Sequence, residues 1–227
     1  MNSSVITFPG SNCDRDMDVA LKKFGFKNRM VWHDDDELPK CDLVILPGGF
    51  SYGDYLRCGS MASKSKIMKS VISFANSGGK VMGICNGFQI LVEAGLLPGV
   101  LLRNKYLEFI CKNVFVKINN KDNPYFKGLI KDTFEFHIAH NEGNYFCTKE
   151  QIKEIDDNNQ IALFYSDESG SIIEENNPNG SIKNIAGIFN KEKNILGMMP
   201  HPERMIDPAL SGEDGSIFFE NLINNLK

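Results

Sequence analysis

The segment GICNG at residues 83–87 centres on Cys85, between an apolar run at residues 81–84 and a helical pattern at residues 88–94. A side chain at such a strand-to-helix turn is held out from the carboxyl edge of a sheet, and flanking glycines permit the tight backbone. The N-terminus of the following helix favours a thiolate. The segment therefore predicts a cysteine nucleophile, although a buried structural cysteine stays open as an alternative from this segment alone.

A histidine and a glutamate follow another apolar run, in the segment MPHPER at residues 199–204. A residue before proline is pushed toward extended backbone, and residues two apart in an extended chain face the same side. Glu203 can then hold one nitrogen of His201 and leave the other free to take a proton from a thiol. The alternative is a proline-rich loop with an exposed ion pair of Glu203 and Arg204. Together with the cysteine turn, the catalytic interpretation is favoured.

Amide cleavage also needs hydrogen-bond donors at the oxygen that gains negative charge. The turn Pro-Gly-Gly at residues 47–49 ends an apolar run, and Gly49 has no side chain to obstruct its backbone N–H. The second expected donor is the N–H of Asn86, which follows the cysteine. An ordinary turn after a strand is the alternative for the glycine pair. With the cysteine, histidine and glutamate, these donors predict hydrolysis of a carboxamide through a thioester.

The elements that must position these residues alternate along the chain. Apolar runs typical of buried strands lie at residues 5–8, 30–32, 43–46 and 81–84, and helical spacing recurs at residues 17–24, 67–75, 88–94 and 218–226. Strands that alternate with helices predict a parallel sheet covered on both faces. After residue 109, apolar residues alternate at 114–118 and 134–138, and a hairpin is expected over 185–199. We predict an α/β fold in one domain over residues 1–227, with a mostly parallel central sheet, helices on both faces and antiparallel strands in the C-terminal half.

Length and composition exclude several classes of protein. A chain of 227 residues that is 42% hydrophobic can bury a full core, and its net charge of -4, with both signs mixed, forms no basic stripe for nucleic acid. No stretch is long and apolar enough to span a membrane and no basic leader precedes the first apolar run, so we expect no membrane association and a cytoplasmic location. The six cysteines show no zinc-knuckle spacing, so free thiols and no metal site are expected.

Five segments together resemble one known family. They are FPGSNCDR at residues 8–15, LPGGFSYGDYLR at 46–57, GICNGFQIL at 83–91, HNEGNY at 140–145 and MPHPER at 199–204. The chain is similar over nearly its whole length to the glutamine amidotransferase (glutaminase) subunits of phosphoribosylformylglycinamidine synthase. The cysteine turn and the His-Pro-Glu element are shared by all triad-type class I glutamine amidotransferases. The FSYGDYLR and CNGFQ forms point to the purine-synthesis enzyme in particular.

The resemblance implies a subunit that hydrolyses glutamine to glutamate and passes ammonia to a large synthetase subunit, with a third small subunit often present. The synthetase converts formylglycinamide ribonucleotide to formylglycinamidine ribonucleotide in purine biosynthesis. The chain has no phosphate-binding G-x-x-x-x-G-K-[ST] loop. We therefore expect no cofactor on this chain, and ATP with magnesium on the synthetase subunit.

The resemblance also assigns residues by position. It implies a triad of the nucleophile Cys85, the base His201 and its orienter Glu203, with the oxyanion donors Gly49 and Asn86. It further implies that glutamine is held by Gln89 and by the loop at residues 140–145, through His140 and Tyr145. From the residues alone, His140 could equally cap the sheet. An amidotransferase subunit of another pathway, a stand-alone cysteine hydrolase and a catalytically idle regulatory subunit are the remaining alternatives.

Overall fold

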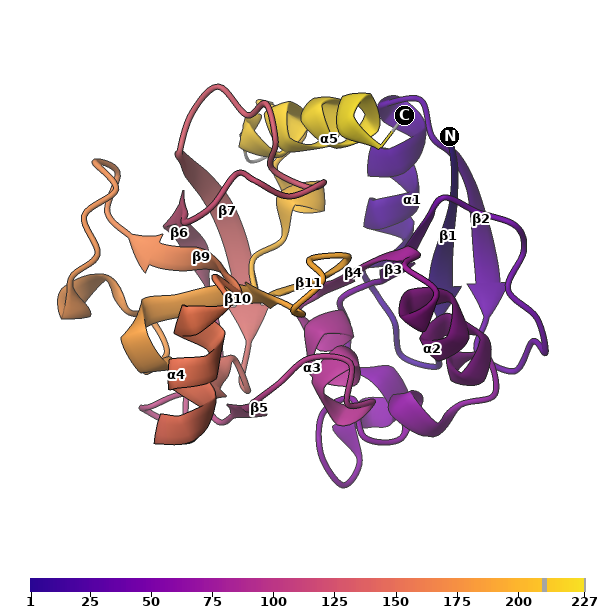
Figure 1. Cartoon of the computed structure of the whole chain (residues 1–227), viewed down its shortest axis with the longest axis horizontal. Coiled ribbons are helices and arrows are strands. Elements are labelled where there is room, and N and C mark those ends of the chain that lie inside the picture. The colour runs from indigo at the N-terminus through magenta and orange to yellow at the C-terminus, as the bar shows by residue number, and fades with distance from the viewer. Residues whose placement is uncertain (210–211, 227) are drawn as a thin grey trace.

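The computed structural model describes residues 1–209 and 212–226 (Figure 1). One nine-stranded sheet crosses the molecule in the order β2-β1-β3-β4-β11-β10-β9-β6-β7. Its strands are β1 (Asn2–Thr7), β2 (Lys27–Trp32), β3 (Leu43–Leu46), β4 (Lys80–Ile84), β6 (Ile110–Ile118), β7 (Thr133–His140), β9 (Ile161–Ser166), β10 (Ile185–Phe189) and β11 (Ile195–Met198). A separate two-stranded sheet pairs β5 (Val100–Leu102) with β8 (Asn144–Phe146).

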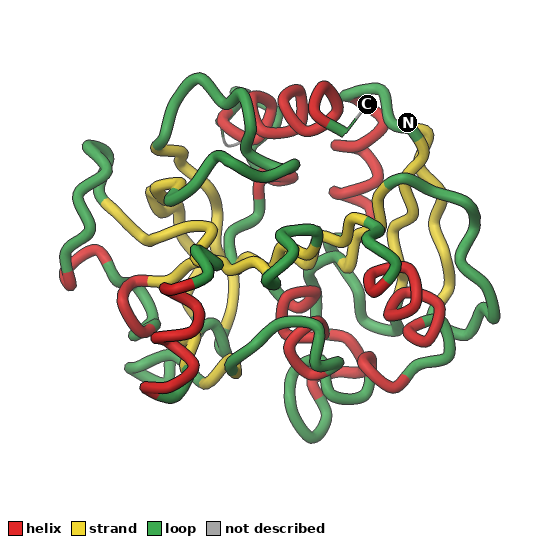
Figure 2. Tube along the Cα trace, in the orientation of Figure 1, coloured by secondary structure: helices red, strands yellow, loops and turns green. Residues whose placement is uncertain are grey.

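The half of the large sheet that contains β2, β1, β3, β4 and β11 is parallel throughout. All four residues of β3 are buried, as expected for a strand covered on both faces. Helices α1 (Asp14–Lys23) and α5 (Asp214–Asn225) lie on one side of the sheet, and α2 (Met68–Asn76) and α3 (Asn86–Glu93) lie on the other (Figures 1 and 2). The predicted parallel sheet with helices on both faces is confirmed.

The other half of the sheet is antiparallel. Strand β10 pairs with β11 and β9, and β6 pairs with β9 and β7, each pair antiparallel. Buried and partly buried residues alternate strictly along β7, as the sequence pattern predicted. The predicted hairpin is present as β10 and β11, so the predicted fold class, with antiparallel strands in the C-terminal half, is confirmed.

Several local features differ from the sequence predictions. Helix α4 (Lys149–Asp157) and strands β5, β8 and β9 were not predicted. Helix α1 begins after Cys13, with no side-chain cap. All six cysteines are unpaired, as predicted. No helix within the described residues is both long and apolar enough to cross a membrane.

The loops after β1, β3, β4 and β11 leave the same edge of the parallel half. Parallel strands point the same way, so their carboxyl ends meet at one edge, and ligands of open α/β sheets bind outside that edge. The segments singled out from the sequence at residues 47–49, 83–87 and 199–204 lie at or directly after the carboxyl ends of three of these strands. The fold therefore gathers them at one place.

Candidate active site

Cys85 occupies the turn between β4 and α3 with a strained backbone. Its φ of 51° and ψ of -106° lie where a residue with a side chain is disfavoured, by roughly 1–3 kcal/mol. The surroundings enforce this geometry: the N–H of Cys85 donates to the carbonyl of Met198 at 2.8 Å. A Cβ on Gly87 would lie 1.8 Å from the carbonyl oxygen of Leu46, and one on Gly83 would lie 2.6 Å from the carbonyl oxygen of Gly87. Only glycine fits on either side of the thiol.

His201 and Glu203 form a buried pair on the loop after β11. Nδ1 of His201 lies 2.7 Å from Oε1 of Glu203, and the side chains are 1% and 0% exposed. The contact predicted from the sequence is present. A short 3-10 turn at Pro202–Arg204 brings the two side chains together, whereas the sequence analysis expected a continuous extended chain. The N–H of His201 donates to the carbonyl of His137 at 2.8 Å, which ties this loop to β7.

The surroundings of His201 favour its protonated form. Burial alone would lower the pKa of His201, but the Glu203 carboxylate and then the Cys85 sulfur hold that pKa well above its ordinary value. Nε2 of His201 is buried and makes no hydrogen bond of normal geometry. Cys85 is itself buried, with its sulfur 3.7 Å from the carbonyl oxygen of Ala139. A thiol next to such an imidazole can give up its proton and become a nucleophile.

The two predicted oxyanion donors lie on neighbouring loops. Gly49 has a φ of 144°, in the region open mainly to glycine. A Cβ on Gly48 would lie 2.6 Å from Cε1 of His201, so this turn packs directly against the imidazole. Asn86 opens α3, and its Oδ1 accepts from the N–H of Ser51 at 3.2 Å. The structure thus joins the glycine turn to the cysteine turn.

Gln89 is buried in α3, and both ends of its amide already have protein partners. Its Oε1 accepts from Nδ2 of Asn86 at 2.9 Å, and its Nε2 donates to the carbonyl of Glu142 at 2.7 Å. Gln89 therefore connects the cysteine turn to the loop after β7. Its contacts are those of a residue that positions two loops, and its predicted contact with glutamine stays a prediction.

His140 lies at the end of β7, with Nδ1 3.1 Å from Oδ1 of Asn104. Burial, with the nearby charge of His201, lowers the pKa of His140 to about 3. Asn104 also donates to the carbonyl of His140 at 2.9 Å and accepts from the N–H of Gly143 at 3.1 Å. His140 is therefore a neutral, fixed group, and its buried Nε2 has no partner. No pattern in the sequence indicated Asn104, which is 36 residues away from His140.

Tyr145 is not brought to the site. It is 1% exposed, its hydroxyl donates to the carbonyl of Pro98 at 3.0 Å, and its ring stacks on Phe88 with centroids 6.0 Å apart. A Cβ on Gly99 would lie 2.5 Å from the same hydroxyl. Tyr145 packs in the core, because β8 turns it inward, and its position does not support the predicted contact with glutamine.

The loop after β3 carries two titratable groups that the sequence analysis did not predict, the carboxyl of Asp54 and the thiol of Cys58. Burial, with the carboxylates of Asp54 and Glu142, raises the pKa of the Cys58 thiol far above its ordinary value. Burial also raises the pKa of Asp54, whose Oδ1 has no partner. Cys58 is therefore a protonated, unreactive thiol, in contrast to Cys85, which lies beside an imidazole.

Within the described residues, one group of side chains brings metal-ligand atoms together. Atoms of Cys13, His201 and Glu203 all lie within 4.8 Å of one another. Nη2 of Arg204 donates to Sγ of Cys13 at 3.0 Å, and Glu203 already holds His201. A guanidinium on the sulfur opposes the approach of a cation, so the arrangement suits proton transfer better than metal binding.

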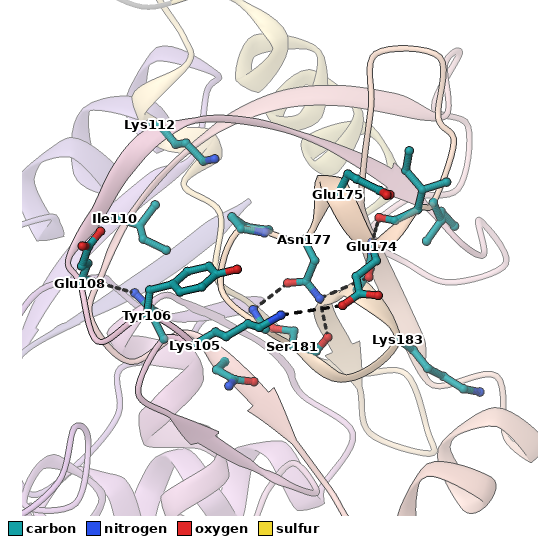
Figure 3. A pocket seen from close by; sticks show the side chains of 17 residues that line it. Lys105, Tyr106, Glu108, Ile110, Lys112, Glu174, Glu175, Asn177, Ser181 and Lys183 are labelled. Atoms are coloured by element: carbon teal, nitrogen blue, oxygen red, sulfur yellow. Dashed lines mark hydrogen bonds and ion pairs between the residues drawn. The ribbon is translucent and has the colours of Figure 1, made fainter.

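A broad groove lies on the antiparallel half, outside the group around Cys85 (Figure 3). Its volume is about 1100 Å³, and its walls come from residues 104–112 and 172–184, with Asn144. Charged side chains of both signs line it: Lys105, Lys112, Lys183, Glu108, Glu174 and Glu175. Cys85, His201 and Glu203 are not among its lining residues, so it is separate from the candidate active site.

Comparison with known proteins gives a consistent result. Residues 1–212 match the family described as CobB/CobQ-like glutamine amidotransferase domain. A Pelagibacter ubique protein named phosphoribosylformylglycinamidine synthase subunit PurQ is 85% identical over 227 residues, which is 100% of both chains. The PurQ subunit of Gloeobacter violaceus is 48% identical over 98% of this chain and 97% of its own. The structure of PurLQS from Thermotoga maritima matches with a TM-score of 0.87 and 40% identity, covering 100% of this chain and 99% of that one.

Proposed function

This chain belongs to the family of CobB/CobQ-like glutamine amidotransferase domains, and from its similarity to PurQ subunits we infer that it is the glutaminase subunit of phosphoribosylformylglycinamidine synthase. An identity of 85% over the full length of a PurQ subunit supports this reaction over that of other amidotransferases. The subunit hydrolyses glutamine to glutamate and delivers ammonia for the conversion of formylglycinamide ribonucleotide to formylglycinamidine ribonucleotide in purine biosynthesis.

The partner of the chain is the large synthetase subunit, PurL, and the PurLQS assembly of the Thermotoga relative indicates a small PurS subunit as well. We propose that ATP and magnesium are bound by the synthetase subunit, since this chain has no phosphate-binding loop of the G-x-x-x-x-G-K-[ST] type. We also propose a cytoplasmic location. Six unpaired cysteines suit a reducing compartment.

We propose that Cys85 attacks the carboxamide carbon of glutamine. Nε2 of His201 takes the proton from Sγ of Cys85 while Glu203 holds Nδ1, so the ring keeps the correct orientation and the imidazolium is stabilised. The sulfur then bonds to the amide carbon, and the carbonyl oxygen becomes an oxyanion. The backbone N–H groups of Gly49 and Asn86 are the proposed donors to that oxygen.

The tetrahedral intermediate collapses when the His201 imidazolium gives its proton to the amide nitrogen. The carbon–nitrogen bond breaks, ammonia leaves, and a thioester remains on Cys85. His201 next takes a proton from water, whose oxygen attacks the thioester carbon. The carbon–sulfur bond then breaks, the proton on His201 returns to the sulfur, and glutamate is released.

The observation that carries this proposal is the buried 2.7 Å contact of His201 with Glu203 beside a thiol in a strained turn. An idle regulatory subunit would have no use for the strain at Cys85, which persists only because the surrounding backbone enforces it.

The test is Cys85→Ala in the assembled complex, with Cys41→Ala as a matched control at a cysteine remote from the site. Glutamine-dependent activity should disappear in Cys85→Ala, while activity with added ammonium salt stays at the level of the unmodified complex. Retention of glutamine-dependent activity would contradict the proposal. So would loss of both activities in a complex that assembles normally.

A further inference from the structure

A second cysteine lies beside the imidazole of His201, and the proposed mechanism does not use it. Cys13 follows β1 in the segment FPGSNCDR, and it is 3% exposed. Nη2 of Arg204 donates to its Sγ at 3.0 Å. Ligand-type atoms of Cys13, His201 and Glu203 lie within 4.8 Å of one another. The sulfur therefore belongs to the immediate surroundings of the base.

Cys13 connects the glycine turn to the loop that carries His201. Its N–H donates to the carbonyl of Gly48 at 3.3 Å. A Cβ on Gly48 would lie 3.1 Å from Sγ of Cys13 and 2.6 Å from Cε1 of His201. The sulfur and the imidazole thus pack against the same glycine, and neither can move toward it freely.

A second contact holds the Arg204 guanidinium in place while it donates to Cys13. Its Nε lies 3.4 Å from a carboxylate oxygen of Asp16, in the first turn of α1. The guanidinium makes the sulfur of Cys13 a hydrogen-bond acceptor in this position. Such a sulfur stabilises a neighbouring imidazolium. Of the groups that oppose the effect of burial on the pKa of His201, Cys13 follows Glu203 and Cys85.

We propose that Cys13 is a positioning residue of the active site: its sulfur, held by Arg204, fixes the plane of the His201 imidazole and favours the form that carries the proton of Cys85. This inference rests on the proposed function, because it assigns Cys13 a role through His201. The titratable and charged groups that face His201 are Glu203 and Arg204 on its own loop, Cys85 on the cysteine turn, Cys13 after β1, and His137 and His140 on β7.

The test compares Cys13→Ala and Cys13→Ser in the assembled complex, with Cys41→Ser as the control. The glutaminase kcat of Cys13→Ala should fall about 10- to 100-fold, the size expected when a reacting group is misplaced. KM should stay within about twofold, because the sulfur of Cys13 is buried and is proposed to act through His201. Cys13→Ser should lose less, since a hydroxyl still accepts from Arg204.

The pH profile separates this role from a purely structural one. Removing a group that raises the pKa of His201 should move the alkaline limb of the glutaminase kcat profile toward lower pH in Cys13→Ala. Activity with added ammonium salt should equal that of the Cys41→Ser control, which shows that the complex is folded and assembled. A structural defect would lower the activities with glutamine and with ammonium salt and leave the alkaline limb of the pH profile in place. That result would count against the inference.

The outcomes distinguish the inference from the proposed function. Unchanged kcat and an unchanged limb in both Cys13 variants, with Cys85→Ala inactive, would overturn the inference and leave the proposed function standing. Glutaminase activity in Cys85→Ala would overturn the proposed function itself. Where Cys13→Ala fails to assemble, Cys13→Ser decides: a lowered kcat with a shifted limb supports the role, and full activity with an unshifted limb refutes it.

Discussion

Strands of the parallel half point their carboxyl ends at one edge of the sheet, whereas strands of the antiparallel half leave at alternating edges. Consequently the loops after β1, β3, β4 and β11 all reach the site, with Cys13, Gly49, Cys85 and His201 on them. The antiparallel half contributes chiefly the end of β7 and the loop that follows it. The groups proposed for the chemistry come from the first half, and fixed neutral groups such as His140 come from the second.

Two buried histidines, one from each half of the sheet, show the same difference between the two halves. His201, on the loop after β11, contacts the carboxylate of Glu203, and its pKa lies well above the ordinary value. His140, on β7, contacts the amide of Asn104, and burial lowers its pKa to about 3. Both rings are equally hidden from water, so the partner decides which form is stable. A histidine with a carboxylate partner can hold a proton, whereas a buried histidine with an amide partner stays neutral.

The largest effect is expected from removing the charge that distinguishes the two histidines. Glu203→Gln keeps the shape of the side chain but loses the carboxylate, so the imidazolium of His201 is no longer stabilised. Glutaminase kcat should fall about 10³- to 10⁴-fold, as when the carboxylate of a comparable triad is replaced by an amide. The alkaline limb of the pH profile should also move to lower pH. Steady-state assays of the assembled complex measure both, and a loss below tenfold would mean that burial alone orients the ring.

A second prediction concerns how tightly the parallel half is packed behind the cysteine turn. In Gly87→Ala the new Cβ would lie 1.8 Å from the carbonyl oxygen of Leu46, so β3 and α3 would have to separate. The free energy of unfolding should fall by more than about 3 kcal/mol, as in other overpacked cores.

Gly78→Ala is the matched control for this substitution. Gly78 has a φ of 89° with nothing within 4 Å of an added Cβ, so only backbone strain of about 1 kcal/mol is expected. Denaturant titrations of the purified subunit compare the two variants. Equal losses would mean that the turn can relax and that the close approach of α3 to β3 is not essential.

The smallest effect is expected in the antiparallel half, from the neutral histidine. The pKa of His140 is about 3 in the folded chain against an ordinary value of 6.5, so folding favours the neutral form. The stability that depends on this neutral form is complete above pH 6.5 and is lost as the pH falls toward 3. Between pH 7 and pH 5.5 the free energy of unfolding should fall by about 1 kcal/mol more in the unmodified subunit than in His140→Gln. Parallel curves for the two proteins would show that His140 takes up a proton as readily in the folded state as in the unfolded state.

Much of the fold could be predicted because its pattern is local. Continuous apolar runs indicated the strands of the parallel half, and strict alternation indicated β6 and β7. Helix α4 was missed because only Ile155 in it is buried, so it has no apolar stripe. Its capping box of Thr148 and Gln151 was the signal that could have found it.

Local patterns of residue type were enough to predict turns and contacts that lie within single segments. The turn around Cys85, the pairing of His201 with Glu203 and the glycine turn at Gly49 each span a few consecutive residues, so residue type and spacing were sufficient. Contacts between two distant segments became visible only in the folded chain. The fold placed Cys13 against Arg204, 191 residues away, fixed His140 with Asn104 and turned Tyr145 into the core. Such contacts depend on which loops leave the same edge of the sheet, and local periodicity carries no information about that.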